Sequence, residues 1–285
     1  VRHTGGAMPR LGHGPFSHTF EHFVNESPPV GNNDVERGSW THEQASIELL
    51  EHMMRPGTSL AHAMEAEGLG ETDATFVKEI IVGHGLGADG AFVGRPSRAQ
   101  RFLYDIVNNP RSGLDVDKLD YLARDSVHAL GDRIDFGRLL MNARVAPIRS
   151  IGGKSDDEEG TSTICFPEKL VHEVLSVFRK RFELHTAVYQ HPAVKAYELM
   201  LVDVLHLAND HVRIGPKQLR LSEAVHDVDS YCMLKDSVLD LIEASPDQAL
   251  RPAQQLLQRM RTRDGYKCVG KVVLENFGEV TDEDR

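Results

Sequence analysis

Two histidines, His13 and His18, lie in the glycine-rich segment 11–18, which reads LGHGPFSH. Glycine permits a tight turn and a close approach of the backbone to a ligand. An imidazole there can donate to phosphate oxygens or transfer protons. A third histidine, His42, follows Thr41, a predicted helix N-cap, in the segment 40–44, WTHEQ. These segments predict a phosphate-facing histidine site, and well-bonded structural histidines are the alternative.

A second segment whose side chains could bind a ligand or take part in catalysis is 113–125, which reads GLDVDKLDYLARD. At 100° per residue on a helix, five polar residues, counted from Asp117, lie within an arc of roughly 120°. Leu119, Leu122 and Ala123 lie on the other side. Two carboxylates, two cations and a phenol on one face suit a phosphate site with a divalent metal. A solvated face with i,i+4 ion pairs is the alternative. The residues of this arc are Asp117, Lys118, Tyr121, Arg124 and Asp125.

A third segment, 181–191, reads RFELHTAVYQH. Arg181, His185 and Tyr189 recur at i, i+4 and i+8, so a continuous α-helix would place them on one face. The arginine could bind a terminal phosphate, and the tyrosine could stack on a base or sugar.

The elements that must position these residues are mostly helical. Apolar periodicity predicts helices at 43–54, 75–82, 167–187, 194–209, 225–243 and 252–261. Short strands are predicted at 143–148 and 162–166, around the acidic segment 152–163, and a further one at 271–274. Polar loops are predicted at 27–39 and 83–96. The pattern predicts a mainly α fold with minor β structure.

The amino-acid composition limits the kinds of partner that the chain is expected to bind. The chain has 285 residues, with 32 Lys and Arg against 43 Asp and Glu, for a net charge of −11. This balance gives no indication of a nucleic-acid partner, so an anionic ligand must be held at a local site. No apolar run approaches the ~20 residues that span a bilayer, and no signal segment opens the chain. We therefore expect an intracellular protein, nuclear or cytoplasmic and without a membrane partner. The three separated cysteines, Cys165, Cys232 and Cys268, are expected to be reduced and inert in the core.

In this order, the segments resemble the HD-domain deoxynucleoside triphosphate (dNTP) triphosphohydrolases, including the animal enzymes that carry SAM and HD domains. The resemblance spans most of residues 11–270. It implies an HD-domain helical bundle with a smaller C-terminal α/β lobe and a homo-oligomer, dimer or tetramer, that GTP or dNTP effectors assemble. It also implies a divalent metal (Fe, Mn, Mg or Zn) and hydrolysis of dNTPs such as dGTP to a deoxynucleoside and triphosphate. The matching strings are 11–18, 40–44, 102–125 (FLYDIVNNPRSGLDVDKLDYLARD), 143–145 (ARV) and the LH…YQH pattern at 184–191.

Roles follow residue by residue from the resemblance. Asp117 would ligate the metal, and His18 would give a proton to the leaving deoxynucleoside oxygen. His42 would support this network, and Glu21 would orient the proton donor. The substrate-binding residues would be His13, Lys118 and Arg181 at the phosphates, Tyr121, Asp125 and Tyr189 at the sugar and base, and His185 on the same helix face. The effector-binding candidates are Arg144, Lys169, Arg263 and Lys267, while Pro167 and Pro192 stand where relatives often carry cations.

One departure from the family pattern is central. Pro9 and Arg10 occupy the places of the His-Asp pair that names the family, and the further histidine ligand would precede Val1. Proline cannot ligate, and arginine places a cation where a metal cation must bind, so we expect a severely weakened metal site and little hydrolysis. One hypothesis is a shifted reading frame: codons ATG CCA CGA for Met8 to Arg10, read one nucleotide later, begin Cys-His-Asp.

The expected organisation is a damaged or non-native segment 1–10, a phosphohydrolase core 11–210, and a regulatory or oligomerisation lobe 211–285. Two other functions stay open. One is a non-catalytic nucleotide-binding or oligomerisation protein. The other is an HD phosphodiesterase for another phosphorylated substrate, which Tyr121, Asp125 and Tyr189 disfavour.

Overall fold

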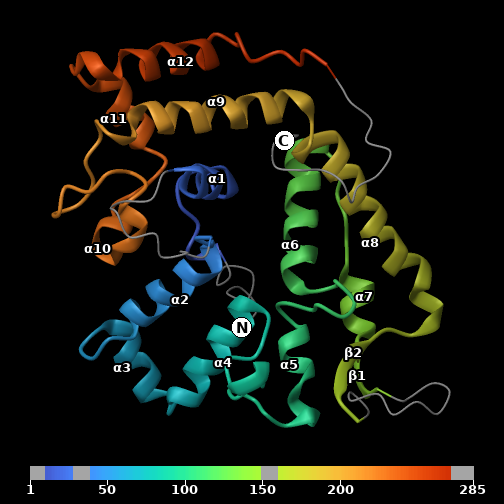
Figure 1. The fold of residues 1–285 in the computed structure, drawn as a ribbon. Helices are drawn as coiled ribbons and strands as arrows, with labels where there is room; N and C mark the ends of the chain where they lie inside the picture. Colours follow the sequence, from blue (N-terminus) through green and yellow to red (C-terminus); the bar gives the residue numbers. More distant parts are fainter. Residues whose placement is uncertain (1–9, 28–38, 149–159, 271–285) are drawn as a thin grey trace.

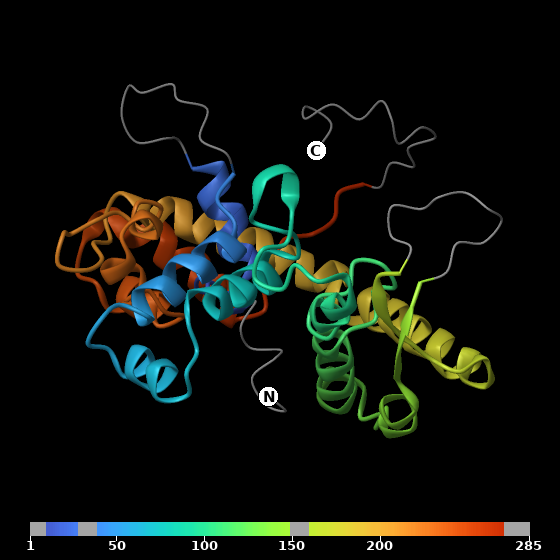
Figure 2. The ribbon, with the colours of Figure 1, turned by 90° about the horizontal axis from the view of Figure 1, so that it is seen from below.

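The computed structural model describes residues 10–27, 39–148 and 160–270. In this part the chain is mainly helical, with a single two-stranded sheet, as the sequence predicts. The helices fall into two groups that α9 (Pro192–Asn209) connects, as Figures 1 and 2 show.

The first group combines the N-terminal and C-terminal helices of the described chain (Figure 1). The main core of this group contains Phe20 and Phe23 from α1 and Met200 and Leu205 from α9, all fully buried, while α3 and α4 pack on α2 in a separate, smaller cluster. Burial of such large apolar side chains is the main stabilising contribution to a core. The helices of this group are α1 (His18–Glu26), α2 (His42–Met53), α3 (Ser59–Ala66), α4 (Glu71–Val82), α10 (Val228–Tyr231), α11 (Val238–Ala244) and α12 (Arg251–Arg261).

The second group has its own core, in which Leu122 of α6 packs with Val177 and Leu184 of α8. The antiparallel strands pair Arg144 with Cys165 and Pro147 with Ser162. The elements of this group are α5 (Phe102–Asp105), α6 (Val116–Asp125), α7 (Gly137–Asn142), β1 (Arg144–Pro147), β2 (Ser162–Cys165) and α8 (Val171–Leu184).

Local signals explain several boundaries. The Thr41 side chain accepts from Gln44 N and starts α2, as predicted, and Asp115 accepts from Lys118 N to start α6. The predicted strands at 143–148 and 162–166 are confirmed. The helix predicted from residue 75 begins earlier, at Glu71, because the Asp73 side chain accepts from Gly70 N.

Two helix predictions were wrong. The segment 225–243 is not one helix, because α10 ends at Tyr231 and α11 begins only at Val238. The helix predicted to reach residue 187 ends as α-helix at Leu184, and a π-helical turn, His185–Tyr189, follows. The strand predicted at 271–274 lies outside the described residues.

The cysteine prediction was wrong in part. Cys232 and Cys268 are exposed and Cys165 is half-buried, so none of them is a buried core residue, although all three are unpaired as expected. Among the described helices, none has both the length and the apolar character to cross a membrane.

The predicted division at residue 210 stays a prediction. The core of the first group takes residues from both sides of that position, such as Phe20 and Leu257. Within 211–270 the β pairing is one isolated bridge between Ile214 and Leu219.

Candidate functional site

The backbone of the segment that carries the histidines lies directly against α2. Gly12 N donates to the Ser46 hydroxyl at 2.8 Å, and the Tyr231 hydroxyl donates to Gly12 O at 2.6 Å. A Cβ at Gly12 would lie 2.2 Å from Ser46 N and 2.3 Å from His42 O. Only glycine allows so close an approach, so Gly12 is what lets this segment lie beside the start of α2.

The turn into α1 is conformationally unusual. Phe16 and Ser17 have φ angles of 61° and 55°, in the left-handed region that residues with a Cβ rarely adopt. Phe16 N donates to Asp236 Oδ1 at 3.0 Å, which helps to hold this conformation. Strained backbone of this kind is frequent at functional sites. It places His18 as the first residue of α1.

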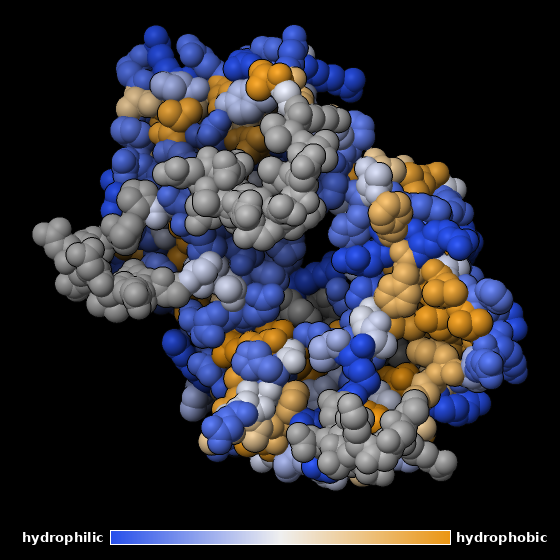
Figure 3. Space-filling model, turned by 45° about the vertical axis from the view of Figure 1, so that its right-hand side comes forward, coloured by the Kyte–Doolittle hydropathy of each residue, from blue (hydrophilic) through white to orange (hydrophobic). Residues whose placement is uncertain are grey.

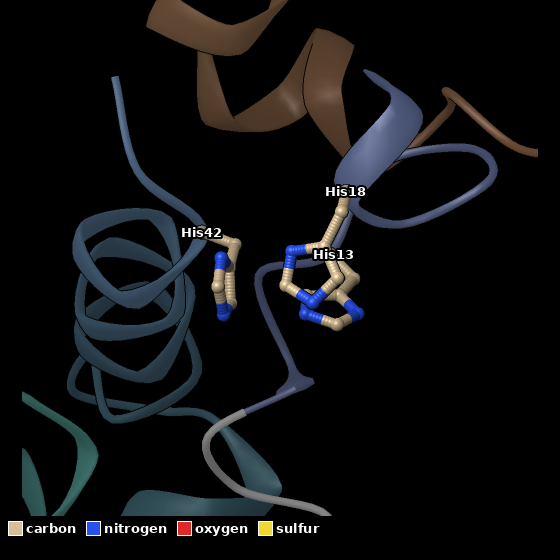
Figure 4. A group of neighbouring side chains, drawn as sticks. All are labelled: His13, His18 and His42. Carbon is tan, nitrogen blue, oxygen red and sulfur yellow. The ribbon is translucent and has the colours of Figure 1, made fainter. Parts of the chain in front are cut away.

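Three histidines form a cluster, shown in Figure 4. The ring centroid of His13 lies 4.3 Å from that of His42 and 5.1 Å from that of His18, and His18 and His42 are 5.1 Å apart. His42 comes from the start of α2, so three separate backbone positions converge. We call His13, His18 and His42 the histidine cluster.

Two carboxylates contact this cluster. Glu21 Oε2 lies 2.9 Å from His42 Nδ1 and 3.6 Å from His18 Nδ1. Glu43 Oε1 lies 3.3 Å from His42 Nε2. Glu21 therefore orients His42 most directly and reaches His18 as well, while the His18 side chain is 71% exposed and accessible to a ligand.

Burial keeps His13 neutral. It lowers the pKa of His13 to about 4, and the nearby His42, His18 and Arg10 act in the same direction. Its Nε2 atom is buried and has no hydrogen-bond partner among the described residues. A neutral imidazole with an unused nitrogen can form one more hydrogen bond with a bound molecule, as donor or acceptor according to its tautomer.

The other side of the site is built by α6 and the end of α8. The Tyr121 and Tyr189 rings lie 6.4 Å apart, and His185 lies 5.0 Å from Tyr189. The Tyr189 hydroxyl donates to Asp125 Oδ2 at 2.5 Å. Burial is the main cause that raises the pKa of Tyr121, and a hydrogen bond with Arg181 opposes it. Arg181, Tyr121, Tyr189, Asp125 and His185 are thus brought together, as the family resemblance implies.

The segment 181–189 is not the single α-helix that its spacing predicts. Arg181, His185 and Tyr189 do not continue one α-helix, because Gln190 N donates to His185 O across five residues at 2.8 Å. Such π-helical turns are rare and occur frequently at functional sites. The wider turn rotates Tyr189 relative to an α-helical position, yet it still contacts Asp125.

Arg10 joins the two sides. Its Nη2 atom lies 2.8 Å from Asp117 Oδ1 and donates to Asp117 Oδ2 at 3.1 Å. The Arg10 guanidinium also lies 5.9 Å from the centre of the Tyr121 ring. The cation paired with Asp117 is therefore this guanidinium.

This pair decides whether a divalent metal fits at Asp117. A metal-bound carboxylate oxygen lies ~2.1 Å from the ion, and a guanidinium at 2.8 Å from the same oxygen would repel that ion. Arg10 supplies no ligand atom either, because it has no acceptor. The described residues around Asp117 therefore do not fit a divalent metal.

Other donor groups lie close by. Within the described ranges, two sets have three donor atoms within 4.8 Å of one another, and neither contains Asp117. They are His13, His18 and His42, and Glu21, His42 and Glu43. A metal held by either set would not be the ion that the family pattern places at Asp117.

The remaining predicted site residues are distributed as follows. Lys118 Nζ lies 3.6 Å from Asp115, one helix turn from the start of α6. Arg144 opens β1, and Lys169 lies in the 3₁₀ turn Glu168–Leu170 before α8. Arg263 and Lys267 follow α12, a helix that Figure 1 shows at the top of the molecule, with β1 and β2 at the bottom. The four effector candidates therefore come from two distant regions, and their role stays a prediction.

Sequence reasoning missed several residues that position the site. Tyr231 and Asp236 bond the histidine segment from more than 200 positions away along the chain. No local pattern could have indicated these contacts. By contrast, Glu43 is the next residue after His42 and Ser46 follows it at i+4, so the predicted helix already placed both near it.

The chain is similar to known proteins over most of its length. No family model matches the chain. The chain is 35% identical over 271 residues to the deoxynucleoside triphosphate triphosphohydrolase SAMHD1 of Homo sapiens, covering 92% of this chain and 40% of that protein. It is 31% identical over 268 residues to the SAMHD1 homolog of Dictyostelium discoideum, covering 93% of this chain and 43% of that protein. It is also 27% identical over 286 residues to an HD domain-containing protein of Acanthamoeba polyphaga mimivirus, covering 94% and 52%.

The chain thus spans about 40% of the length of the animal relatives that it matches. The match nevertheless extends over 92% of this chain, so it includes the central helices α6 and α8. The resemblance to the HD-domain deoxynucleoside triphosphate triphosphohydrolases is therefore confirmed at the level of sequence similarity.

Proposed function

We propose that this chain carries the substrate site of a dNTP triphosphohydrolase and that its hydrolytic step is impaired. The observation that carries the proposal is the ion pair between Arg10 and Asp117. A guanidinium occupies the place where the family pattern calls for a divalent cation. Residues that the resemblance assigns to the substrate, among them His13 and Tyr121, lie on both sides of that pair.

The binding half of the proposal rests on the cations and phenols along α6 and α8. Arg181 contacts Tyr121, and Lys118 lies on the same helix as Asp117. These two cations would bind phosphate oxygens, which accept charge-assisted hydrogen bonds strongly. Tyr121 and Tyr189 would lie against the sugar and base, and Asp125 would accept from the 3′-hydroxyl.

The chemical half rests on the histidine cluster. His18 is the most accessible of the three, and it would give a proton to the leaving deoxynucleoside oxygen, with Glu21 holding the donor. His42, bonded to Glu21, would fix the position of that carboxylate. We assign no step to a metal, because the surroundings of Asp117 do not fit one.

A second function, nucleotide binding without any hydrolysis, is favoured by the same ion pair. The two functions differ in one measurable quantity, the rate of product formation. An HD phosphodiesterase for another substrate is disfavoured because Asp125 and Tyr189 already form the pair expected beside a deoxyribose.

The test is a product assay with dGTP and Mn²⁺. The chain as given should bind dGTP saturably and release little or no deoxyguanosine and triphosphate. The double variant Pro9→His/Arg10→Asp, which restores the family pair, should release more of both products than the given chain, and Arg10→Lys, which keeps the cation, should not. Rapid turnover by the given chain would refute the impairment, and absence of dGTP binding would refute the substrate site.

Assembly and regulation belong to the proposal too. Exposed apolar side chains lie along α7, β1 and α8, on the half of the molecule where Figure 3 shows extended apolar areas. Phe182 is 70% exposed and Met141 is 78% exposed. Such patches mark protein interfaces, which supports a homo-oligomer; nucleotide effectors between its subunits are proposed from the family resemblance. A nuclear or cytoplasmic location is proposed with it.

A further inference from the structure

A cavity of about 260 Å³ lies apart from the candidate site, and none of its lining residues belongs to that site. It opens between the end of α4, the loop 83–96, α5 and Thr161, which precedes β2. Three arginines line it: Arg98, Arg101 and Arg111.

The two carboxylates of the lining are engaged by the fold. Glu79 is fully buried and accepts from Val93 N at 2.7 Å, Gly94 N at 3.0 Å and the Tyr104 hydroxyl at 2.5 Å. Asp105 is buried and accepts from the Thr163 hydroxyl at 2.6 Å. Both carboxylates therefore hold the walls of the cavity together.

Arg101 has an unused hydrogen-bond donor. Its guanidinium lies 3.6 Å from the centre of the Phe92 ring, and its Nη1 atom is buried with no hydrogen-bond partner among the described residues. Burial lowers the pKa of Arg101, and the charge of Arg111 acts in the same direction, while Tyr104, Glu79 and Asp105 oppose this shift. A buried donor without an acceptor is destabilising, and so is the approach of two like charges.

We propose that this cavity is a second anion site, which takes a small phosphate-bearing ligand. A phosphate group would accept from Arg101 Nη1 and would neutralise the repulsion between Arg101 and Arg111. Guanidinium groups bind phosphate oxygens with good geometric fit. The cavity lies just below the ~300 Å³ at which typical small-molecule sites begin. Inorganic phosphate, pyrophosphate or the phosphate end of a larger molecule would therefore fit. This inference does not depend on the proposed function.

The test is a calorimetric titration of the full 285-residue chain with pyrophosphate at constant ionic strength. The candidate site also contains phosphate-facing cations, so the titration is repeated in the Arg181→Gln variant. One saturable binding event should persist in Arg181→Gln and weaken at least tenfold in Arg101→Gln and in Arg111→Gln. The matched control is Arg261→Gln, which removes a surface arginine that pairs with Glu243 on α11 and should leave this event unchanged.

Folding is checked separately by circular dichroism and thermal unfolding. Arg101 packs on an aromatic ring, so its variant could lose structure. Arg111 is exposed, and Arg111→Gln carries the test in that case. The proposal is overturned if pyrophosphate shows no saturable binding in Arg181→Gln, or if a cavity variant that remains folded binds it as tightly as the same chain without that substitution.

Discussion

The two sides of the candidate site are positioned by different means. The histidine cluster depends on a backbone segment with a close glycine contact at Gly12 and left-handed residues at Phe16 and Ser17. The opposite side depends on helix spacing, with Asp117, Lys118, Tyr121 and Asp125 all on α6. A site of this kind combines one precise loop with one regular helix, and the two sides should respond differently to substitution.

The ion pair between Arg10 and Asp117 connects these sides. Each side has its own hydrophobic core, one with Phe20 and Phe23 and the other with Leu122 and Leu184. This side-chain pair therefore links the two sides of the site, whose residues pack in separate cores. Which cation lies beside Asp117 therefore depends on one residue, Arg10, rather than on either core.

The largest effect is expected on the histidine side. Gly12→Ala would place a Cβ 2.2 Å from Ser46 N, and forced overpacking of this kind costs about 3 kcal/mol of the free energy of unfolding. Urea unfolding measures it. Gly70→Ala, at a glycine with open space around it, should cost under ~1 kcal/mol. Equal losses in both variants would mean that the close contact does not position the histidines.

The next effect concerns substrate binding on the helical side. Arg181→Gln should weaken dGTP binding by about 10- to 100-fold, because hydrogen bonds to charged groups contribute ~1.5–3 kcal/mol. Equilibrium titration measures it. Arg179→Gln, two residues earlier on the same helix, points to another face and should change affinity less than ~2-fold. If the two variants bind equally, Arg181 does not face the nucleotide.

A smaller effect separates function from stability. Tyr189→Phe removes the hydrogen bond to Asp125, and Tyr266→Phe removes a similar bond to Asp203 at 2.6 Å outside the site. Each should cost about 1–2 kcal/mol of stability or less. Only Tyr189→Phe should also lower dGTP affinity. Unchanged affinity in Tyr189→Phe would remove Asp125 and Tyr189 from the site.

The helical side of the site could be predicted from the sequence more fully than the histidine side. The α6 face was readable because a regular helix repeats every 3.6 residues, and the Thr41 cap was readable from its residue type. The π-helical turn at His185–Tyr189 could not be predicted, because its residues fit an α-helix equally well. The hydrogen bonds that Tyr231 and Asp236 form with the histidine segment could not be predicted either, because only the tertiary fold brings such distant positions together.

The smallest expected effect is a pH dependence confined to the histidine side. The pKa of His13 is about 4 in the folded chain and ~6.5 when unfolded. The unfolded chain therefore binds more protons between these values, so stability is complete above pH 6.5 and falls as the pH drops toward 4. Substitution His13→Gln should remove about 1 kcal/mol of the loss between pH 7 and pH 5, after allowance for solvent screening.

Chemical unfolding at both pH values measures this effect. The Tyr189→Phe variant is the comparison from the helical side, because burial raises the pKa of Tyr189 well above that range. It should keep the same loss of stability between pH 7 and pH 5 as the given chain. An unchanged pH dependence in His13→Gln would contradict the neutral, buried state of His13.

The most direct test of the account is a Mn²⁺ titration followed by electron paramagnetic resonance, on the given chain and on Arg10→Ala. The account holds that the Arg10 guanidinium occupies the cation position at Asp117. It predicts at least a tenfold gain in Mn²⁺ affinity in Arg10→Ala, and loss of that gain in Arg10→Ala/Asp117→Asn. Tight Mn²⁺ binding by the given chain that Asp117→Asn abolishes would contradict it.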